Sequence, residues 1–437
     1  NLRKKMIYIL LISLAILSWI TYSLKKDIFH PACLICFSFF FSVFCATLNI
    51  DTWGINLSSD IVQLILLGII SFILPCIFIH PNKDTKKEAS GLSKIYVSKN
   101  IILVFLIAQS IFLLLFIVWM KNYLNGNFLD IFNSNIMTEF RFEKSFNQTI
   151  NYPWYINQGI KFSKAFIYII TFLFINNNIS NKRQKQKKQG KTLLVLSILM
   201  YSIQTMLTGG RSELIMYAIY ATSLYFFIYG RLNKRTGTRI GVNTLKIIVL
   251  LAVVLYLFSA SRTLVGRVSE DNPIYYISRY FGGSIPLFDD YLKNPIPKSQ
   301  IIGKEIFFGI NKFLNQIGIL HEDYTIHLEF RSPNGIGLGN VYTAFRRMFQ
   351  DFGAIGIIIL SSIHGAIMAL WYKKIYYARK IKFSTHLILY FMLLHTVVLM
   401  PFSDFFFSTV LSINYINIVL YLTTIIYILK KYNLKIR

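Results

Sequence analysis

Charged residues are scarce in this chain of 437 residues, and acidic residues are the scarcer kind. Only 15% of the residues are charged, with 19 Asp and Glu against 46 Lys and Arg, whereas about a quarter is usual in soluble domains. Cysteine is also rare, and all four copies, Cys33, Cys36, Cys45 and Cys76, lie in apolar runs. Because no further ligands surround the Cys33–Cys36 pair, we interpret these cysteines as small residues of apolar helices and not as a zinc or redox site.

Signature motifs of common catalytic centres are missing as well. The sequence contains no HExxH, no GxSxG and no P-loop. Asp351-Phe352-Gly353 matches one part of the kinase motif set, but nothing else of that set accompanies it. We therefore expect neither a metal site nor a cofactor, and ordinary side chains have to perform any catalysis.

Long apolar runs dominate the rest of the chain. Hydrophobic residues make up 54% of it, and the mean hydropathy is +0.51. Runs of about 20 apolar residues can cross the hydrocarbon layer as a helix, so we predict an all-α polytopic membrane protein with about 11–12 transmembrane helices in one domain, 1–437. The predicted spans are 6–23, 29–49, 60–80, 100–123, 158–177, 192–208, 212–230, 246–263, 353–372, 385–402 and 407–429.

The net charge of +27 could indicate nucleic-acid binding, but its placement favours a role in membrane topology. Basic residues gather in alternate short connections, as the positive-inside rule requires. These connections are 83–99, 182–191, 231–239 and 373–382, together with the C-terminal 430–437. We therefore predict a cytoplasmic C-terminus. Eleven spans then put the N-terminus outside although it carries Arg3, Lys4 and Lys5, so either the first span breaks the rule or the count is off by one.

Two connections on the predicted outer side are long, a first outer loop over 124–157 and a large loop over 264–352. The many aromatic residues of the large loop argue against disorder. Ile302, Ile306 and Ile310 begin a helical repeat that predicts an amphipathic helix over Ile301–Leu320. This helix would lie along the membrane interface or on the protein's own surface. A second helix over Val341–Asp351 is predicted to continue into the next span.

Arginine residues stand at the outer ends of several spans. Arg211 follows the Gly209-Gly210 turn between two spans, Arg262 ends the span 246–263, and Arg347 precedes the span 353–372. A guanidinium binds phosphate bidentately and stays charged, so we interpret the three as a candidate pyrophosphate site. The alternative for each one is a snorkelling side chain or a salt bridge within a loop.

A reacting hydroxyl would need a general base within hydrogen-bond reach. Asp351, His327 and Glu329 are the leading candidates on the predicted outer side, and Asp351 is spaced to pair with Arg347 on one helical face. His364 and His395 lie within predicted spans. We interpret these two as hydrogen-bond partners between helices, not as catalysts.

Three short motifs resemble outer-loop signatures of one protein family. They are Gly209-Gly210-Arg211-Ser212, the stretch 280–292 (YFGGSIPLFDDYL), and GNVYTAF at 339–345 followed by DFGAIG at 351–356. These motifs and the predicted topology together resemble those of the Wzy-type O-antigen polymerases, or oligosaccharide repeat-unit polymerases. The topological resemblance covers most of the chain, and the motifs cover short stretches. Some members repeat an Arg with a Gly after ten intervening residues. No Arg here has Gly at that offset, so the roles of that motif are not carried over.

The resemblance implies a metal-independent membrane glycosyltransferase of the GT-C type in the bacterial inner membrane. Such an enzyme transfers a growing glycan from undecaprenyl pyrophosphate to a sugar hydroxyl of a new lipid-linked repeat unit, at the periplasmic face. We expect Arg211, Arg262 and Arg347 to bind the pyrophosphate. We assign three further residues to substrate binding, namely Arg346, Arg279 and Tyr342. The expected partners are the lipid-linked donor and acceptor, membrane lipids and a chain-length regulator, but no nucleic acid.

Three other functions compete with this one. An O-antigen ligase shares the lipid donor and the large outer loop, and a capsule or exopolysaccharide polymerase is a closer relative. Loss of a polymerase leaves one repeat unit attached to the lipid core, whereas loss of a ligase leaves none. A transporter or flippase of lipid-linked oligosaccharides belongs to another class and would be expected to have two matched halves. The sequence contains no such internal repeat.

Overall fold

The computed structural model describes residues 2–79, 95–97, 99–125, 133–143, 150–181, 191–210, 212–232, 256, 259–260, 272–321, 327–376, 378, 381, 383–433 and 435–436. Helices dominate these residues, and the strands among them are two residues long each, β1 (Ile95–Tyr96) and β2 (Lys435–Ile436). Seven of the described helices are long and apolar enough to cross a membrane. The chain thus has the all-helical architecture of a multi-pass membrane protein, as the sequence predicts.

Most of the predicted spans coincide with helices. The long helices are α1 (Leu2–Lys25), α3 (Ser59–Phe78), α4 (Lys99–Leu124), α6 (Trp154–Asn181), α8 (Ser212–Leu232), α13 (Ala344–Tyr376) and α16 (Ile413–Asn433). The shorter apolar helices are α2 (Pro31–Thr47), α7 (Lys191–Leu207), and α14 (Thr385–Leu393) with α15 (His395–Val398). The remaining predicted span, 246–263, lies outside the described residues except for 256, 259 and 260.

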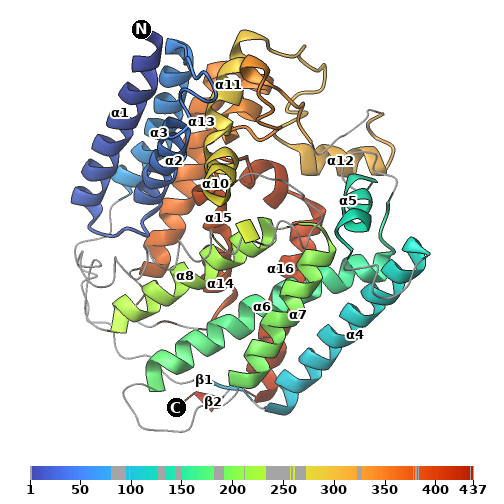
Figure 1. Cartoon of the computed structure of the whole chain (residues 1–437). Helices are drawn as coiled ribbons and strands as arrows, with labels where there is room; N and C mark the ends of the chain where they lie inside the picture. Colours follow the sequence, from blue (N-terminus) through green and yellow to red (C-terminus); the bar gives the residue numbers. More distant parts are fainter. Residues whose placement is uncertain are drawn as a thin grey trace.

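The helices form two groups (Figure 1). In the first, α1, α2, α3 and α13 lie side by side, and α3 packs most closely against α13. Glycines permit this approach, because a Cβ at Gly365 would clash with the carbonyl oxygen of Phe72 and one at Gly68 with the ring of Phe345. Small residues at helix contacts commonly allow tight packing in a membrane, where the hydrophobic effect contributes little to helix association.

The second group is built around α6, which contacts α4, α7, α8 and α16. Most of α6 is buried, and Figure 1 shows it running obliquely across the group. Polar pairs also join these helices. Ser197 of α7 donates to Gln109 Oε1 of α4 at 2.8 Å, and Gln109 Nε2 donates back to the Ser197 carbonyl at 3.2 Å. The short helix α5 (Ser134–Phe142) belongs to the first outer loop.

Contacts between distant segments define the two ends of the molecule. The antiparallel pairing of β1 with β2 places the segment before α4 beside the C-terminus. At the opposite end, Asn334 of the large loop donates to the carbonyl oxygens of Trp53 and Gly54, each at 2.9 Å. The N-terminal end of α1 lies at this second end (Figure 1). It therefore lies opposite the C-terminus, and the number of membrane crossings stays a prediction.

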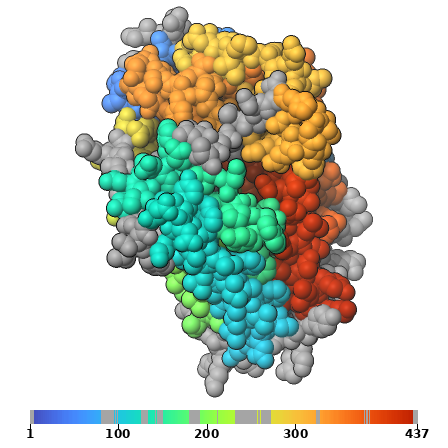
Figure 2. Space-filling model, turned by 90° about the vertical axis from the view of Figure 1, so that its right-hand side faces the viewer, coloured from blue at the N-terminus to red at the C-terminus, as the bar shows by residue number. Residues whose placement is uncertain are grey.

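The described parts of the large loop, 272–321 and 327–342, contain helices that cap this end. They are α10 (Pro273–Gly282), α11 (Ser284–Lys293), α12 (Phe308–Gln316) and the 3-10 turn η5 (Pro333–Gly335). Figure 2 shows this region, in yellow and orange, above α4 in cyan and α16 in red. We call residues 272–321 and 327–342 the outer region. It is attached to the segment 49–58 through Asn49 Nδ2, which donates to Ser278 Oγ at 2.8 Å.

The helix predicted over Ile301–Leu320 is shorter than expected. It begins only at Phe308, and Ile302 is 82% exposed whereas Ile306 is fully buried. Gly303 has a φ of 68° and turns the chain before the helix. The backbone N–H groups of Glu305 and Ile306 donate to the Asp351 side chain and not to helical carbonyls. The second predicted helix is confirmed, because α13 begins at Ala344 and continues through a break at Gly353 (φ 65°) into the span.

Candidate functional site

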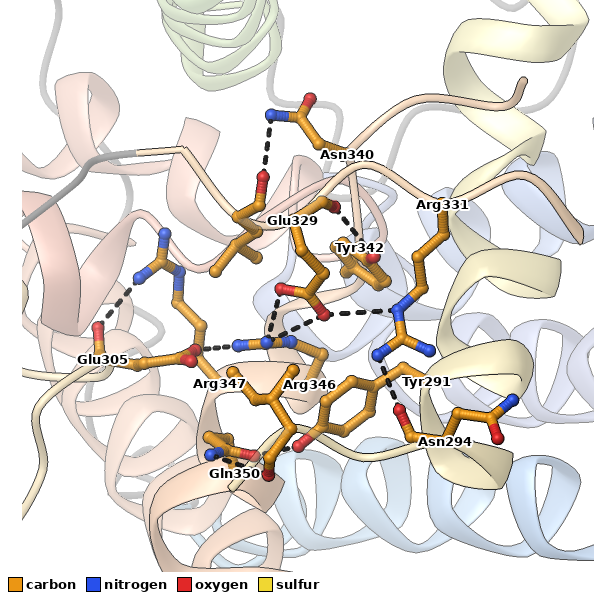
Figure 3. A network of polar contacts seen from close by, with 12 residues as sticks. Tyr291, Asn294, Glu305, Glu329, Arg331, Asn340, Tyr342, Arg346, Arg347 and Gln350 are labelled. Atoms are coloured by element: carbon orange, nitrogen blue, oxygen red, sulfur yellow. Dashed lines mark hydrogen bonds and ion pairs between the residues drawn. The ribbon is translucent and has the colours of Figure 1, made fainter. Parts of the chain in front are cut away.

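The outer region and the start of α13 share a buried ionic network centred on Arg346 (Figure 3). The Arg346 side chain is fully buried and pairs with Glu305 and with Glu329, whose Oε2 lies 2.8 Å from Nη2. Its Cζ also lies 4.5 Å from the ring centroid of Tyr291 and 5.5 Å from that of Tyr342. A planar guanidinium can pair with two carboxylates through its two terminal nitrogens and lie against aromatic rings at the same time. Arg346 thereby joins segments that are distant in sequence.

Arg331 is the second cation of this network. Its Nη1 lies 3.2 Å from Asp290 Oδ2, and its Nη2 donates to the Asn294 carbonyl at 2.6 Å. Its Nε lies 3.4 Å from Glu329 Oε1, so the Glu329 carboxylate is held between two guanidinium groups. Burial lowers the pKa of Arg331, but the hydrogen bond to Asp290 and the charge of Glu329 outweigh this and raise its pKa overall. Arg331 therefore stays positively charged.

Tyrosine hydroxyls complete the network. Tyr291 donates to Gln350 Oε1, and Tyr342 donates to the backbone carbonyl of Glu329 at 3.0 Å. Burial raises the pKa of Tyr291 and of Tyr342, and the negative charge of Glu329 acts in the same direction. Both phenols consequently stay protonated near neutral pH and serve as hydrogen-bond donors.

Asp351 and Arg347 clamp the turn before α12. Asp351 Oδ2 accepts the backbone N–H of Glu305 at 3.1 Å and that of Ile306 at 2.8 Å. Arg347 Nη1 donates to the Glu305 carbonyl at 3.0 Å. The structure thus brings together the predicted site residues Asp351, Glu329, Arg346, Arg347 and Tyr342, and it binds each of them to a partner within the protein.

The other predicted site residues lie apart from this centre or outside the described chain. His327 is half-buried and precedes Glu329 on the same segment. Arg279 lies on α10, where its Cζ is 5.9 Å from the ring centroids of Tyr275 and Tyr276. Arg211 and Arg262 fall outside the described residues, so their convergence with Arg347 stays a prediction.

A second charged cluster lies among the helices of the second group. Lys164 Nζ of α6 is 2.6 Å from Glu213 Oε2 of α8, and Lys164 belongs to the candidate span Trp154–Ile179. The Lys164 side chain is 10% exposed, whereas that of Glu213 is 35% exposed. Ionisable side chains inside a span are costly and rare, and those that occur usually pair or carry a function.

The turn before Glu213 has the form that its glycines predict. Helix α7 ends at Leu207 and α8 begins at Ser212, with Gly209 at a φ of 73° between them. Figure 1 shows that this α7–α8 junction lies below the level of α11 and α12, and not at the outer end of the molecule. Glu213 occupies the first turn of α8, where the helix dipole favours an acidic side chain. The pair is therefore recessed beneath the outer region.

Buried polar side chains from other helices surround the pair. Tyr168 of α6, Tyr201 of α7 and Tyr415 of α16 all interact electrostatically with Glu213. His395 of α15 interacts with both Lys164 and Glu213. Five helices thus contribute to one polar centre inside apolar surroundings.

Residues 395–408 connect this centre to the outer network. The rings of His395 and Phe405 have centroids 5.9 Å apart, and the adjacent Asp404 interacts electrostatically with Arg347. Asp404 accepts the backbone N–H of Ser408 at 2.7 Å, and burial raises the pKa of its carboxyl. His364 Nε2 of α13 lies 3.0 Å from Thr396 Oγ1 of α15, which confirms the interpretation of His364 as a hydrogen-bond partner between helices.

No protein-family model, curated protein or solved structure matches the chain. Its function has to be inferred from the residues and their geometry. Sequence patterns missed the partnership of Lys164 with Glu213 and the place of Asp404 beside Arg347. The available signal for the first was a lysine well inside the predicted span 158–177, because such a residue needs a partner. No comparable signal marks Asp404, since its contact with Arg347 depends on tertiary packing.

Proposed function

We propose that the protein is a GT-C-type membrane glycosyltransferase that polymerises undecaprenyl-pyrophosphate-linked oligosaccharide repeat units into O-antigen polysaccharide. The observation that carries the proposal is the ion pair of Lys164 with Glu213, which lies among apolar helices and leaves the glutamate side chain partly exposed. Ionisable residues within a membrane span are rare and commonly mark a functional site. Here it lies at a recessed turn beneath a folded outer region.

The chemistry has two requirements, a positive environment for the leaving pyrophosphate and a base for the acceptor hydroxyl. Arg346 is committed to Glu305 and Glu329, so Arg347 is the better candidate of the two for the substrate. Arg211 and Arg262 remain its expected companions, because fixed guanidinium groups can stabilise a departing pyrophosphate without a metal ion. The isoprenoid tail of the donor would lie in the bilayer beside the helices.

The proposed orientation follows from the two ends of the molecule. Strand β1 before α4 pairs with β2 in the basic C-terminal segment, and the positive-inside rule assigns this end to the cytoplasm. The outer region lies at the other end, facing the periplasm in a bacterial inner membrane. Lipid-linked repeat units would therefore meet the recessed turn from the outer leaflet.

Glycan profiling of a strain without the protein tests the proposal. We expect single repeat units on the lipid core in place of long polymer, and full-length chains after the gene is restored. Loss of every repeat unit from the core would indicate a ligase instead. In parallel, purified protein in proteoliposomes should convert defined lipid-linked repeat units into a ladder of longer products. Folded protein that leaves intact substrate unchanged would overturn the proposed function.

A further inference from the structure

In the Lys164–Glu213 pair the lysine is buried and the glutamate side chain is partly exposed. Oε2 of Glu213 is buried 2.6 Å from Lys164 Nζ, yet 35% of the Glu213 side-chain surface is accessible. Lys164 itself is only 8% exposed. The lysine therefore holds the carboxylate in place while part of the glutamate can still be reached by another molecule.

Two tyrosine hydroxyls beside this pair are unsatisfied. The hydroxyls of Tyr168 and Tyr415 are buried and form no hydrogen bond with any residue that the structure describes. Both interact electrostatically with Glu213. Tyr168 is fixed in position, because its carbonyl accepts the Tyr220 hydroxyl at 2.6 Å and its ring lies against the Tyr220 ring. Buried polar atoms without partners are uncommon and each requires an explanation, such as a bound molecule.

The outer network offers a poorer base. Glu329 is held by Arg346 and Arg331, and Asp351 Oδ2 accepts two backbone N–H groups. Both carboxylates support the fold of the outer region. Protonating either one would weaken the bonds that it accepts and so destabilise that region. Glu213 has a single ionic partner among the described residues.

We propose that Glu213 is the general base of the transfer reaction and that Lys164 keeps its carboxylate oriented, an inference that rests on the proposed function. Tyr168 and Tyr415 would then bind neighbouring hydroxyls of the acceptor sugar. In the step, the acceptor O–H bond breaks and its proton passes to the Glu213 carboxylate. The acceptor oxygen forms a bond to the anomeric carbon of the donor glycan. The anomeric carbon–oxygen bond to pyrophosphate breaks, and its electron pair leaves on the pyrophosphate oxygen.

The test uses the full-length protein in proteoliposomes with a defined lipid-linked repeat unit. Glu213→Gln should lower the polymerisation rate by about 10²–10⁴-fold, the usual contribution of a general base, while binding of the lipid-linked donor is unchanged. Glu213→Asp should retain part of the rate because it keeps a carboxylate. Glu139→Gln on the exposed face of α5 is the matched control and should polymerise at the wild-type rate.

A double variant separates catalysis from folding. Lys164→Gln with Glu213→Gln removes both charges, so no uncompensated ion is left buried, and it should fold yet be inactive. Tyr168→Phe and Tyr415→Phe remove unpaired hydroxyls and should raise the KM for the acceptor at a nearly constant kcat. Wild-type rates from folded Glu213→Gln or from the double variant would overturn the inference and leave the proposed function standing. A wild-type protein that forms no polymer would overturn both.

Discussion

The two charged clusters of this protein differ in how their charges are neutralised. In the outer network Arg346 and Arg331 each face carboxylates and an aromatic ring, and the carboxylates are bound in return. In the inner cluster a single lysine faces a single glutamate that is still 35% exposed. A closed network fixes the shape of a region, whereas an open pair can react with a substrate. We therefore expect the outer cluster to control stability and the inner one to control activity.

The most severe test of this comparison is Arg346→Met. Methionine fills similar volume but leaves Glu305 and Glu329 without the cation between them. Removing one partner of a buried ion pair costs about 3–5 kcal/mol, so we expect a correspondingly lower free energy of unfolding. Thermal unfolding in detergent and limited proteolysis of the outer region would measure the effect.

Arg279→Met is the matched control for that variant. Arg279 lies over the rings of Tyr275 and Tyr276, and contacts of this kind contribute about 0.5–1 kcal/mol at exposed sites. Equal losses of stability in the two variants would contradict a special role for the Arg346 network. A stable but inactive Arg346→Met protein would instead return Arg346 to the substrate site.

Asp351 tests where the base lies. Asp351→Ala leaves the N–H groups of Glu305 and Ile306 without their acceptor, which should cost about 1–3 kcal/mol. Asp351→Asn keeps an acceptor oxygen, so stability should be largely retained. We expect Asp351→Asn to polymerise lipid-linked units in proteoliposomes. An Asp351→Asn protein that is folded, binds donor and forms no polymer would favour Asp351 over Glu213 as the base.

The sequence predicted the fold more completely than the site. Apolar runs of about 20 residues located the helices because a span must satisfy its own backbone hydrogen bonds, and this demand is visible locally. The Gly209-Gly210 pair predicted a tight turn, which the positive φ of Gly209 confirms. The helix expected over Ile301–Leu320 was too long, because its periodic isoleucines do not reveal the Gly303 turn that Asp351 clamps.

Site residues were harder to predict because their roles depend on partners from other helices. Arg346 and Arg347 are neighbours in sequence, yet Arg346 is bound by two carboxylates whereas Arg347 Nη1 donates to a backbone carbonyl. Glu213 follows the Gly209-Gly210 turn closely, but its partner Lys164 comes from α6, which is separated from α8 by the whole of α7. Periodicity and spacing carry no information about such pairings.

The inner pair should matter much less for stability than for activity. Removing both charges leaves no uncompensated ion buried, and replacing a buried ion pair by hydrophobic residues of similar volume is often close to neutral. We expect Lys164→Gln with Glu213→Gln to change the free energy of unfolding by no more than about 1 kcal/mol. Thermal unfolding in the same detergent as for Arg346→Met gives a direct comparison. If the double variant were as unstable as Arg346→Met, the two clusters would not differ in the way described above.

The smallest effect should come from the rim of the outer region. Lys293 Nζ lies 2.5 Å from Asp289 Oδ2, but the lysine side chain is 51% exposed, and Asp289 also accepts the Ser58 backbone N–H at 3.0 Å. Exposed ion pairs contribute little because water screens them, so Lys293→Gln should cost about 0.5 kcal/mol. Unfolding measured at low and high salt would show whether screening accounts for it. A loss of several kcal/mol would mean that the closed network extends to this rim, and that Arg346 is not its sole centre.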